Sequence, residues 1–243
     1  MKAMILAAGL GTRMHPFTEN TPKALIKIND KTLLEITIEK LISYGFDQIV
    51  INVHHFADQI IQFIEEKKFA AQFYISDEKN KLLDTGGGLK HAESFLNGNE
   101  PFILHNVDIV SNLNLKSLYD FHLSSDAVCS LVVRKRESNR YFLFNEENVL
   151  RGWKNERTGR TIIMNDEKPL TKFAFSGIHV IDPKIFSLMP DKDAFPLATL
   201  YLDIAFENKI CAYIDEKSTW IDVGYPEFVK LAEENYAKLV EVD

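Results

Sequence analysis

Short apolar runs alternate with amphipathic stretches through the first half of the chain, and this alternation predicts strands and helices that follow one another in turn. Strands are expected at residues 3–6, 49–53, 73–75, 101–104 and 127–133. Helices are expected at residues 32–44, 56–69, 85–96 and 115–124. Because this rhythm is typical of strands covered by helices on both faces, we predict an α/β fold with a doubly wound, mainly parallel, Rossmann-like sheet.

The pattern changes in the second half of the chain. Short strands separated by polar turns are expected at residues 141–144, 149–153, 161–164 and 173–181. They predict a small antiparallel insertion or lid around residues 134–172. A helix at 197–207, strands at 210–214 and 220–223 and a last helix at 226–239 are expected after it. Since no repeat or linker interrupts the sequence, we predict a single domain over residues 1–243.

Charge and cysteine content narrow the class of protein. The chain has 28 Lys and Arg against 35 Asp and Glu, a net charge of −7, which disfavours nonspecific binding to nucleic acid or to an anionic membrane. Cys129 and Cys211 match no metal-ligand spacing and are expected to be free thiols in a reducing compartment. The apolar amino terminus is short and broken by glycine, and no run approaches the roughly 18 residues of a membrane span. We expect a cytoplasmic protein.

The loop after the first strand has the composition of a phosphate-binding loop. Small residues at Ala7, Ala8, Gly9 and Gly11 let backbone N–H groups approach a polyphosphate, and Arg13 adds a planar fork of donors that matches phosphate oxygens. In a doubly wound sheet, ligands bind at this edge. The sequence therefore predicts a phosphate-binding loop here.

Two common phosphate loops fit this segment poorly. No Gly-Lys-Ser or Gly-Lys-Thr occurs, so a P-loop is not formed. Met14 stands where the dinucleotide fingerprint needs its third glycine, which disfavours a dinucleotide-dependent oxidoreductase.

The residues around the loop form a longer pattern. They are Gly9, Gly11, Thr12, Arg13, Pro16, Thr18, Pro22 and Lys23. Together they closely resemble the signature of the sugar-phosphate nucleotidyltransferases, also called NDP-sugar pyrophosphorylases. The resemblance is greatest to N-acetylmuramate 1-phosphate uridylyltransferases and mannose-1-phosphate guanylyltransferase-like proteins. It implies the nucleotide-diphospho-sugar transferase fold and transfer of a nucleotidyl group to a sugar 1-phosphate.

The resemblance implies roles for the loop residues. The loop from Ala7 and Ala8 through Gly9, Gly11 and Thr12 would bind the nucleoside triphosphate. Arg13 would contact the phosphates that leave as pyrophosphate, and Lys23 would neutralise the α-phosphate and the incoming sugar phosphate. Charge neutralisation and positioning supply most of the catalysis of phosphoryl transfer.

Two strand-end aspartates resemble the metal ligands of the family. Asp108 ends the strand at residues 102–108, and Asp222 lies in a Trp-x-Asp-x-Gly segment at residues 220–224. The resemblance implies that both bind Mg²⁺, which takes one or two carboxylates and keeps several waters. Asn106 is expected to contact the substrate. Val107 departs from the glycine of many members and puts the identity of the sugar in doubt.

A glycine-rich segment at residues 83–89 is expected at a helix start, where exposed N–H groups suit an anionic or carbonyl partner. By resemblance, Thr85, Gly86 and Gly87 would line the base and ribose. Glu78, a few residues earlier, is a candidate acceptor for a base N–H, and an exposed glutamate without this role is the alternative.

The predicted binding site for the sugar phosphate consists of a later strand and one of two lysines. Ser176 and Gly177 resemble the strand against which the hexose lies. Members place a lysine on the sugar phosphate, and Lys154 and Lys168 both match part of that pattern. Lys154 agrees better with the order of strands, so we favour it and keep both.

The catalytic set implied is therefore Arg13, Lys23, Asp108 and Asp222, with Mg²⁺ as cofactor and a nucleoside triphosphate and a sugar 1-phosphate as partners. UTP with N-acetylmuramate 1-phosphate is the expected pair. A mannose-1-phosphate guanylyltransferase, or a transferase acting on another sugar 1-phosphate or on phosphocholine, is the alternative. A noncatalytic sensor of nucleotide sugars is the rival from another class. The sequence shows no hexapeptide repeats, so we expect no acetyl transfer by a fused domain.

Overall fold

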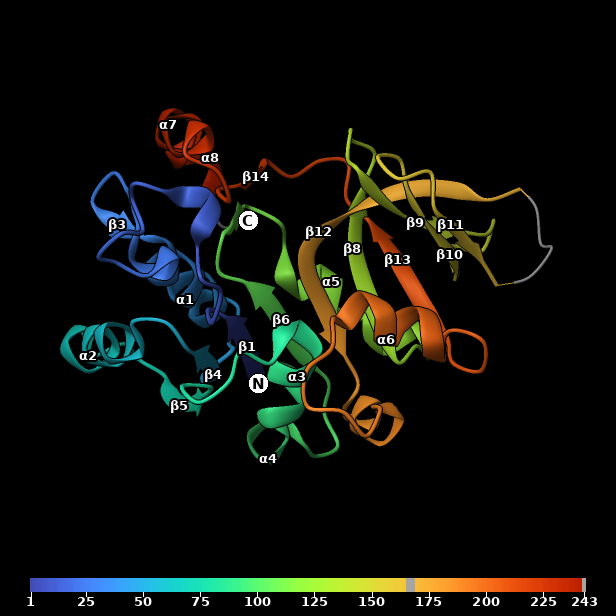
Figure 1. The fold of residues 1–243 in the computed structure, drawn as a ribbon, viewed down its shortest axis with the longest axis horizontal. Coiled ribbons are helices and arrows are strands. Elements are labelled where there is room, and N and C mark those ends of the chain that lie inside the picture. Colours follow the sequence, from blue (N-terminus) through green and yellow to red (C-terminus); the bar gives the residue numbers. More distant parts are fainter. Residues whose placement is uncertain (165–168, 242–243) are drawn as a thin grey trace.

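The computed structural model describes residues 1–164 and 169–241, and a mixed, mostly parallel sheet runs through its centre (Figure 1). The parallel part has the order β5 (Gln72–Asp77), β4 (Gln48–Val53), β1 (Lys2–Leu6) and β6 (Phe102–Asn106). The long strand β12 (Thr171–Ile181) then runs antiparallel to β6, and β8 (Cys129–Arg134) and β13 (Ile210–Ile214) extend the sheet beyond it. The predicted α/β, mainly parallel sheet is confirmed.

Helices cover both faces of the sheet. On one face lie α1 (Leu33–Ser43), α2 (Ala57–Lys67), α5 (Leu115–Ser125) and α7 (Glu227–Glu234). On the other lie α3 (Asp84–His91), α4 (Glu93–Leu96) and α6 (Leu197–Ile204), together with the 3₁₀ helix η3 (Pro183–Leu188). The hydrophobic residues pack in two clusters, one on each side of the sheet.

Strand β1 shows how the sequence produces these two clusters. Ala3 and Ile5 belong to the cluster around α1, whereas Met4, between them, belongs to the cluster around α3. All three are fully buried. Because successive side chains of a strand point to opposite faces, a strand buried on both faces must be apolar at every position. The continuous apolar run in the sequence has this cause.

The predicted antiparallel insertion consists of β9 (Arg140–Phe144), β10 (Leu150–Asn155) and β11 (Thr161–Ile163). β9 pairs with residues 171–173 of β12, while residues 178–181 of the same strand pair with β6. Strand β12 therefore joins the insertion to the central sheet. Gly177, at φ +78°, lies where the pairing changes, and a positive φ is cheap only for glycine.

Two small antiparallel ribbons lie at the edge of the fold, and of their four strands the apolar pattern predicted only β14 (Trp220–Asp222), as the strand expected at 220–223. One pairs β2 (Lys27–Ile28) with β3 (Lys31–Thr32). The other pairs β7 (Ile109–Ser111) with β14 (Trp220–Asp222). The 3₁₀ helices η1 (Thr12–Met14) and η2 (Lys23–Leu25) lie in the long connection after β1.

Two predicted helices are each divided in two. The helix expected at 85–96 is divided into α3 and α4, which meet at Ala92. The Ala92 N–H still donates to the Gly88 carbonyl at 3.2 Å, as in a continuous helix. The apolar pattern therefore does not reveal the division. The helix expected at 226–239 is α7 and α8 (Tyr236–Leu239), which meet at Asn235. The Asn235 side chain donates to the Leu231 carbonyl at 2.8 Å, a local bond that competes with regular helix.

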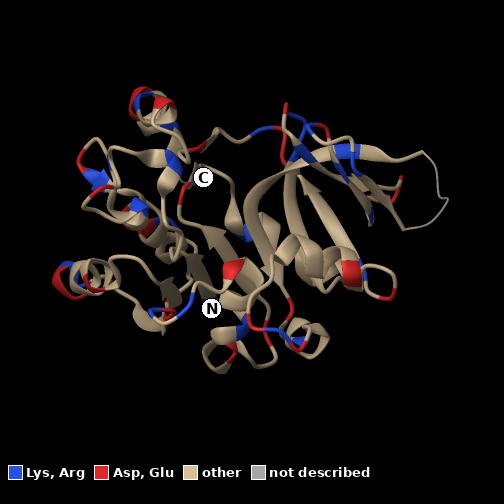
Figure 2. Ribbon diagram, in the orientation of Figure 1, with Lys and Arg blue, Asp and Glu red and all other residues tan. Residues whose placement is uncertain are grey.

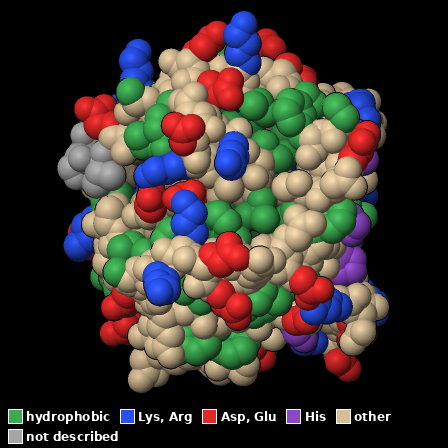
Figure 3. Space-filling view, turned by 90° about the vertical axis from the view of Figure 1, so that its left-hand side faces the viewer, with side chains coloured by type: hydrophobic (Ala, Val, Ile, Leu, Met, Phe, Trp, Pro, Cys, Tyr) green, Lys and Arg blue, Asp and Glu red, His purple; other side chains and the backbone are tan. Residues whose placement is uncertain are grey.

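Charged residues lie mainly in loops and on helices, and the central strands carry few of them (Figure 2). On the face in Figure 3, acidic and basic side chains are interspersed with apolar ones, without a broad basic area among the residues described. Cys129 and Cys211 are free and buried, as expected. Within the described ranges, no helix is long and apolar enough to cross a membrane.

Candidate functional site

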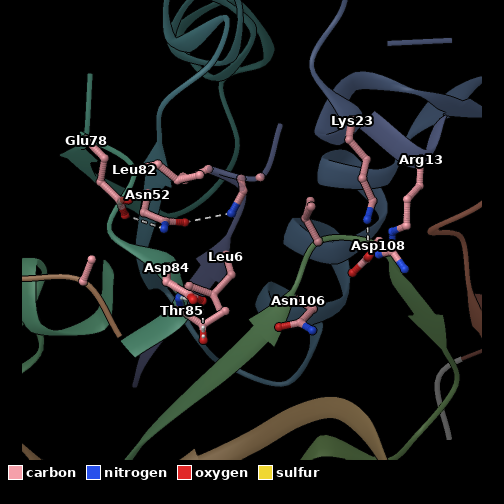
Figure 4. Close-up of a pocket in the computed structure, with 15 residues that line it drawn as sticks. Leu6, Arg13, Lys23, Asn52, Glu78, Leu82, Asp84, Thr85, Asn106 and Asp108 are labelled. Carbon is pink, nitrogen blue, oxygen red and sulfur yellow. Dashed lines mark hydrogen bonds and ion pairs between the residues drawn. The ribbon is translucent and has the colours of Figure 1, made fainter. Parts of the chain in front are cut away.

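The carboxyl ends of the parallel strands meet at one cavity of about 570 Å³ (Figure 4). Leu6 at the end of β1 is in register with Asn52 of β4 on one side and Asn106 of β6 on the other. The lining residues are Leu6, Ala7, Ala8, Gly9, Arg13, Lys23, Asn52, Glu78, Leu82, Asp84, Thr85, Asn106, Val107, Asp108 and Ala194. Segments far apart in the sequence therefore meet at the sheet edge where the phosphate loop was predicted.

The loop after β1 is held in shape by its own contacts. The Ala7 N–H donates to Asn52 Oδ1 at 2.7 Å, and Thr18 Oγ1 donates to the Gly11 carbonyl at 2.9 Å. Gly11 has φ +67°, and a Cβ there would lie 2.9 Å from Thr18 Cγ2. A Cβ at Gly9 would meet nothing within 4 Å. Gly11 is thus needed for the turn, while Gly9 leaves open space beside the cavity.

Thr12 lies next to this cavity rather than on its wall. A smaller hollow of about 280 Å³ is lined by residues 9–14, together with Lys23, Leu82 and Gly224. It shares Gly9, Arg13, Lys23 and Leu82 with the main cavity. The predicted phosphate loop therefore borders two adjoining hollows.

Lys23 and Asp108 form an ion pair at one end of the cavity (Figure 4). Their side chains are only 13% and 14% exposed. Lys23 begins η2 and Asp108 follows β6, so the pair joins the long first connection to the sheet edge. Lys23 is thus a partly buried cation beside the loop that is expected to bind phosphate, and partial burial strengthens its attraction for an anion.

Arg13 approaches the same point from the other side of the loop. Its guanidinium carbon lies 4.6 Å from the centre of the Tyr225 ring. Burial lowers the pKa of Arg13, but the contact with Tyr225 and the charges of Asp222 and Asp108 outweigh burial and raise it above its usual range. Arg13 therefore stays a cation beside two carboxylates.

The ribbon of β7 and β14 brings the second aspartate to the first. Asp222 pairs with Ile109, and the Val223 N–H donates to the Asp108 carbonyl at 2.8 Å. A Cβ on Gly224 would lie 2.6 Å from Asp222 Oδ1, 3.3 Å from Arg13 Nη2 and 3.5 Å from Asp108 Oδ2. The three charged groups converge on this glycine.

The two carboxylates have the properties of a divalent-cation site. Asp222 Oδ1 is buried and has no hydrogen-bond partner, and burial, followed by the charge of Asp108, raises the pKa of Asp222. A bound cation would relieve both effects. The described part of the chain contains no group of three ligating His, Cys, Asp or Glu side chains. Two carboxylates suit Mg²⁺, which also takes substrate phosphates and water as ligands.

The opposite end of the cavity contains a buried carboxylate. Glu78 is 3% exposed, so the alternative of an exposed glutamate is wrong. Asn52 Nδ2 donates to its Oε1 at 2.7 Å, and the Leu83 N–H donates to its Oε2 at 3.2 Å. These bonds fix the carboxylate plane toward the cavity wall, where it can accept a further hydrogen bond.

The three glycines of α3 have a packing role. Gly86 and Gly87 are buried, and both N–H groups donate to the Phe195 carbonyl, at 2.8 and 3.3 Å. A Cβ on either would overlap the segment at residues 193–195. Their amides already have an acceptor, which corrects the expectation of exposed N–H groups at these two positions. Thr85 lies on the cavity wall, and contact of the segment with a base or ribose stays a prediction.

Ser176 and Gly177 do not line the cavity, but Gly177 lies next to Asn106, which does. A Cβ on Gly177 would lie 2.5 Å from Ile109 Cγ1 and 3.1 Å from Asn106 Nδ2. Ser176 Oγ is buried without a hydrogen-bond partner. Lys154, on β10, is 37% exposed, forms an ion pair with Glu156 at 3.0 Å and does not line the cavity. Lys168 lies outside the described residues, and the roles of both lysines stay predictions.

Sequence reasoning missed Asn52 and Arg136. Asn52 bridges Ala7 and Glu78, and one signal for it was a polar residue inside an apolar strand. Arg136 lies in the loop after β8, lines neither hollow and packs on Trp220 beside the Asp222 strand. No local pattern marked it, because Trp220 is far away in the sequence.

Comparisons with known proteins agree with this geometry. Residues 2–238 match the family model described as nucleotidyl transferase. The N-acetylmuramate alpha-1-phosphate uridylyltransferase of Caulobacter vibrioides is 33% identical, with 98% of this chain and 97% of that protein covered. The UTP–glucose-1-phosphate uridylyltransferase of Synechocystis is 28% identical over 92% of this chain, but only 60% of its own length is covered.

Solved structures show the same fold. HddC from Yersinia pseudotuberculosis, complexed with GMP-PN, has a TM-score of 0.77 at 23% identity, with 97% of this chain and 99% of that chain covered. A UDP-glucose pyrophosphorylase complexed with UDP-glucose has a TM-score of 0.74 at 19% identity, with 98% of each chain covered. With its family match and its 33% identical relative, this chain belongs to the sugar-phosphate nucleotidyltransferase family.

Proposed function

We propose that the protein transfers a nucleotidyl group from a nucleoside triphosphate to a sugar 1-phosphate in the presence of Mg²⁺, and that its physiological pair is UTP and N-acetylmuramate 1-phosphate. The observation that supports the reaction best is the meeting of Lys23, Arg13 and Asp108 at one end of a 570 Å³ cavity, with Asp222 beside them outside its lining. Two cations and two carboxylates at one point suit the joining of two anionic phosphates.

The chemistry is a direct displacement. A phosphate oxygen of the sugar 1-phosphate attacks the α-phosphorus of the nucleotide, a new O–P bond forms, and the bond to the β-phosphate oxygen breaks so that pyrophosphate leaves. The attacking phosphate is already ionised near neutral pH, so no side chain has to remove a proton. Lys23 and Arg13 offset the negative charge of the approaching phosphates and hold them in line.

Asp108 and Asp222 would hold the Mg²⁺, which supplies further neutralisation of phosphate charge when bound. The protein prepares this site by keeping Asp222 Oδ1 without another partner and by fixing Asp108 with Lys23. When a phosphate binds, Lys23 would pair with a phosphate oxygen in place of Asp108.

The carboxylate of Glu78 favours a nucleotide whose base presents an N–H donor to it. A carboxylate accepts hydrogen bonds, so it favours the N3–H of uracil and disfavours cytosine, whose N3 is an acceptor. Guanine also presents N–H donors, and a guanylyltransferase is therefore the second candidate. The 33% identity to a uridylyltransferase along nearly its whole length favours UTP.

The test is a pyrophosphate-release assay that crosses five nucleotides with a set of acceptors. UTP, GTP, CTP, ATP and dTTP are each combined with N-acetylmuramate, N-acetylglucosamine, glucose and mannose 1-phosphates and with phosphocholine. We expect one strongly preferred pair, UTP with N-acetylmuramate 1-phosphate, and loss of release with EDTA. Preference for GTP with mannose 1-phosphate would replace the substrate assignment. Nucleotide-induced thermal stabilisation without release for any pair would indicate a sensor.

A further inference from the structure

The loop after β8 places Arg136 beside the strand that ends in Asp222. Its guanidinium carbon lies 4.7 Å from the centre of the Trp220 ring. Trp220 and Asp222 are two residues apart on β14, so their side chains lie on the same face of that strand. Asp222 is close enough to raise the pKa of Arg136, against the larger lowering by burial. A cation thus lies on the Asp222 side of the site, apart from Arg13 and Lys23.

The guanidinium of Arg136 has no carboxylate partner among the residues that the structure describes. Nη2 donates to the Phe175 carbonyl at 2.9 Å and Nη1 to the Glu137 carbonyl at 3.2 Å, while Nε is buried without a partner. In the portion of the chain that the structure covers, no ion pair within 4 Å includes Arg136. Arg134 contrasts with it, because it packs on the same ring at 5.5 Å but pairs with Asp215 at 3.0 Å.

Arg136 is also tied to the strand expected to face the sugar. It donates to the carbonyl of Phe175, and the Trp220 Nε1–H donates to the next carbonyl, that of Ser176, at 2.9 Å. Gly177, the next residue, lies against Asn106 at the floor of the cavity. The guanidinium therefore lies against strand β12 and the ring of Trp220, two residues before Asp222.

We propose that Arg136 binds the phosphate group of the acceptor sugar phosphate. The inference rests on the proposed function, in which the acceptor phosphate attacks the α-phosphorus in line with the leaving pyrophosphate. A guanidinium offers a planar set of donors that matches phosphate oxygens, and a half-buried position strengthens that attraction. Lys154, the lysine favoured from sequence, is instead paired with Glu156.

Arg136→Gln and Arg136→Lys test this assignment, with Lys135→Gln as the matched control. Lys135 is the adjacent cation, 68% exposed and 3.8 Å from Glu216. We expect Arg136→Gln to raise the KM of the acceptor about 10- to 100-fold, the size of a lost charge-assisted hydrogen bond, with the KM of the nucleotide unchanged. Arg136→Lys should recover part of the affinity, because it restores the charge without the fork. Lys135→Gln should behave as wild type.

The outcomes separate this inference from the proposed function. Wild-type protein that releases no pyrophosphate with any pair would refute the function and the inference together. Wild-type turnover with an unchanged acceptor KM in Arg136→Gln would refute the inference alone. An equal rise in both KM values would show that Arg136 only holds β12, and melting curves of both variants check their folding. A loss limited to an acceptor that carries a carboxylate, with glucose 1-phosphate unaffected, would assign Arg136 to that carboxylate and overturn the phosphate assignment.

Discussion

Lys23 and Asp108 form an ion pair across 85 positions of the sequence, and both side chains are largely buried. The pair joins the long segment after β1 to the end of β6. The cation and the carboxylate therefore take their positions only when the sheet has formed. Each neutralises the other before any substrate is present. Such preorganisation reduces the rearrangement that charged groups undergo during reaction.

Asp108→Asn should lower kcat by at least about 10²- to 10³-fold, because an amide offsets neither Lys23 nor a bound cation. Nucleotide binding should largely survive, since Arg13 and the first loop are unchanged. Pyrophosphate release and calorimetric titration with nucleotide measure the two effects. Asp120→Asn, at an exposed carboxylate on α5, is the control. Turnover of Asp108→Asn close to that of Asp120→Asn would contradict the assignment.

Asp222→Asn should abolish turnover and yet stabilise the metal-free protein at pH 7. Burial, and then Asp108, raises the pKa of Asp222, so the folded state holds this proton to a higher pH than the unfolded state. Protonated Asp222 therefore contributes to the free energy of unfolding at low pH. This contribution is lost as the pH rises from the unfolded pKa of about 4 through the raised pKa of the folded protein. Below that range both proteins are neutral at this position and should melt alike.

Melting curves in EDTA test this effect. The melting temperature of Asp222→Asn should exceed that of the wild type at pH 7, by roughly 2–4 °C for each kcal/mol relieved. Added Mg²⁺ should raise the melting temperature of the wild type and leave the variant unchanged. A variant that melts below the wild type at pH 7 would show that the charges of Lys23 and Arg13, which lower the pKa of Asp222, outweigh its burial and the charge of Asp108.

Glu78→Gln should weaken discrimination between uracil and cytosine. A carboxylate only accepts, whereas an amide also donates and so tolerates the N3 acceptor of cytosine. The ratio of kcat/KM for CTP to that for UTP should rise about tenfold, the equivalent of one hydrogen bond. Asp77→Asn, at the neighbouring exposed carboxylate, is the control and should leave the ratio unchanged. An unchanged ratio in Glu78→Gln would place the base away from this carboxylate.

The parallel sheet and the phosphate loop were predictable from local signals, whereas Lys23, Asp108 and Asp222 were expected from the family resemblance. Strands buried on both faces are apolar at each position, and ligands in such a sheet gather at the carboxyl ends of the strands. These two facts brought the loop after β1 and the end of β6 to one edge, and the structure places Arg13, Lys23 and Asp108 around one cavity there.

The remaining features depend on contacts between distant segments. Asp222 reaches Asp108 through β7, a strand of three residues that has no distinct apolar pattern. The amides of Gly86 and Gly87 are taken by the Phe195 carbonyl, more than a hundred positions away, so a glycine-rich helix start that suggested ligand binding is used for packing. Arg136 and Lys40 are likewise defined by partners that no sequence window contains.

Lys40 gives the last prediction, because it is a partly buried lysine behind the site. It lies on α1, and its Nζ donates to the carbonyl of Ser111 on β7, the strand that pairs with the Asp222 strand. Burial lowers the pKa of Lys40 to about 7, although the charge of Asp215 opposes this effect. Between this pKa and the ordinary value of 10.5, the unfolded chain binds a proton that the folded protein does not.

The stability of the wild type should therefore rise with pH across this window, by at most about 1.4 kcal/mol per pH unit from this group. Lys40→Met removes the group while keeping an unbranched side chain. Urea unfolding at pH 7, 8 and 9 should show the wild type gaining stability relative to Lys40→Met as pH rises. Lys116→Met, at an exposed lysine of α5, controls for the loss of a charge and should follow the wild type. If the curves of wild type and Lys40→Met stay parallel from pH 7 to 9, Lys40 remains protonated in the folded protein and its burial beneath the β7–β14 ribbon is tolerated as a charge.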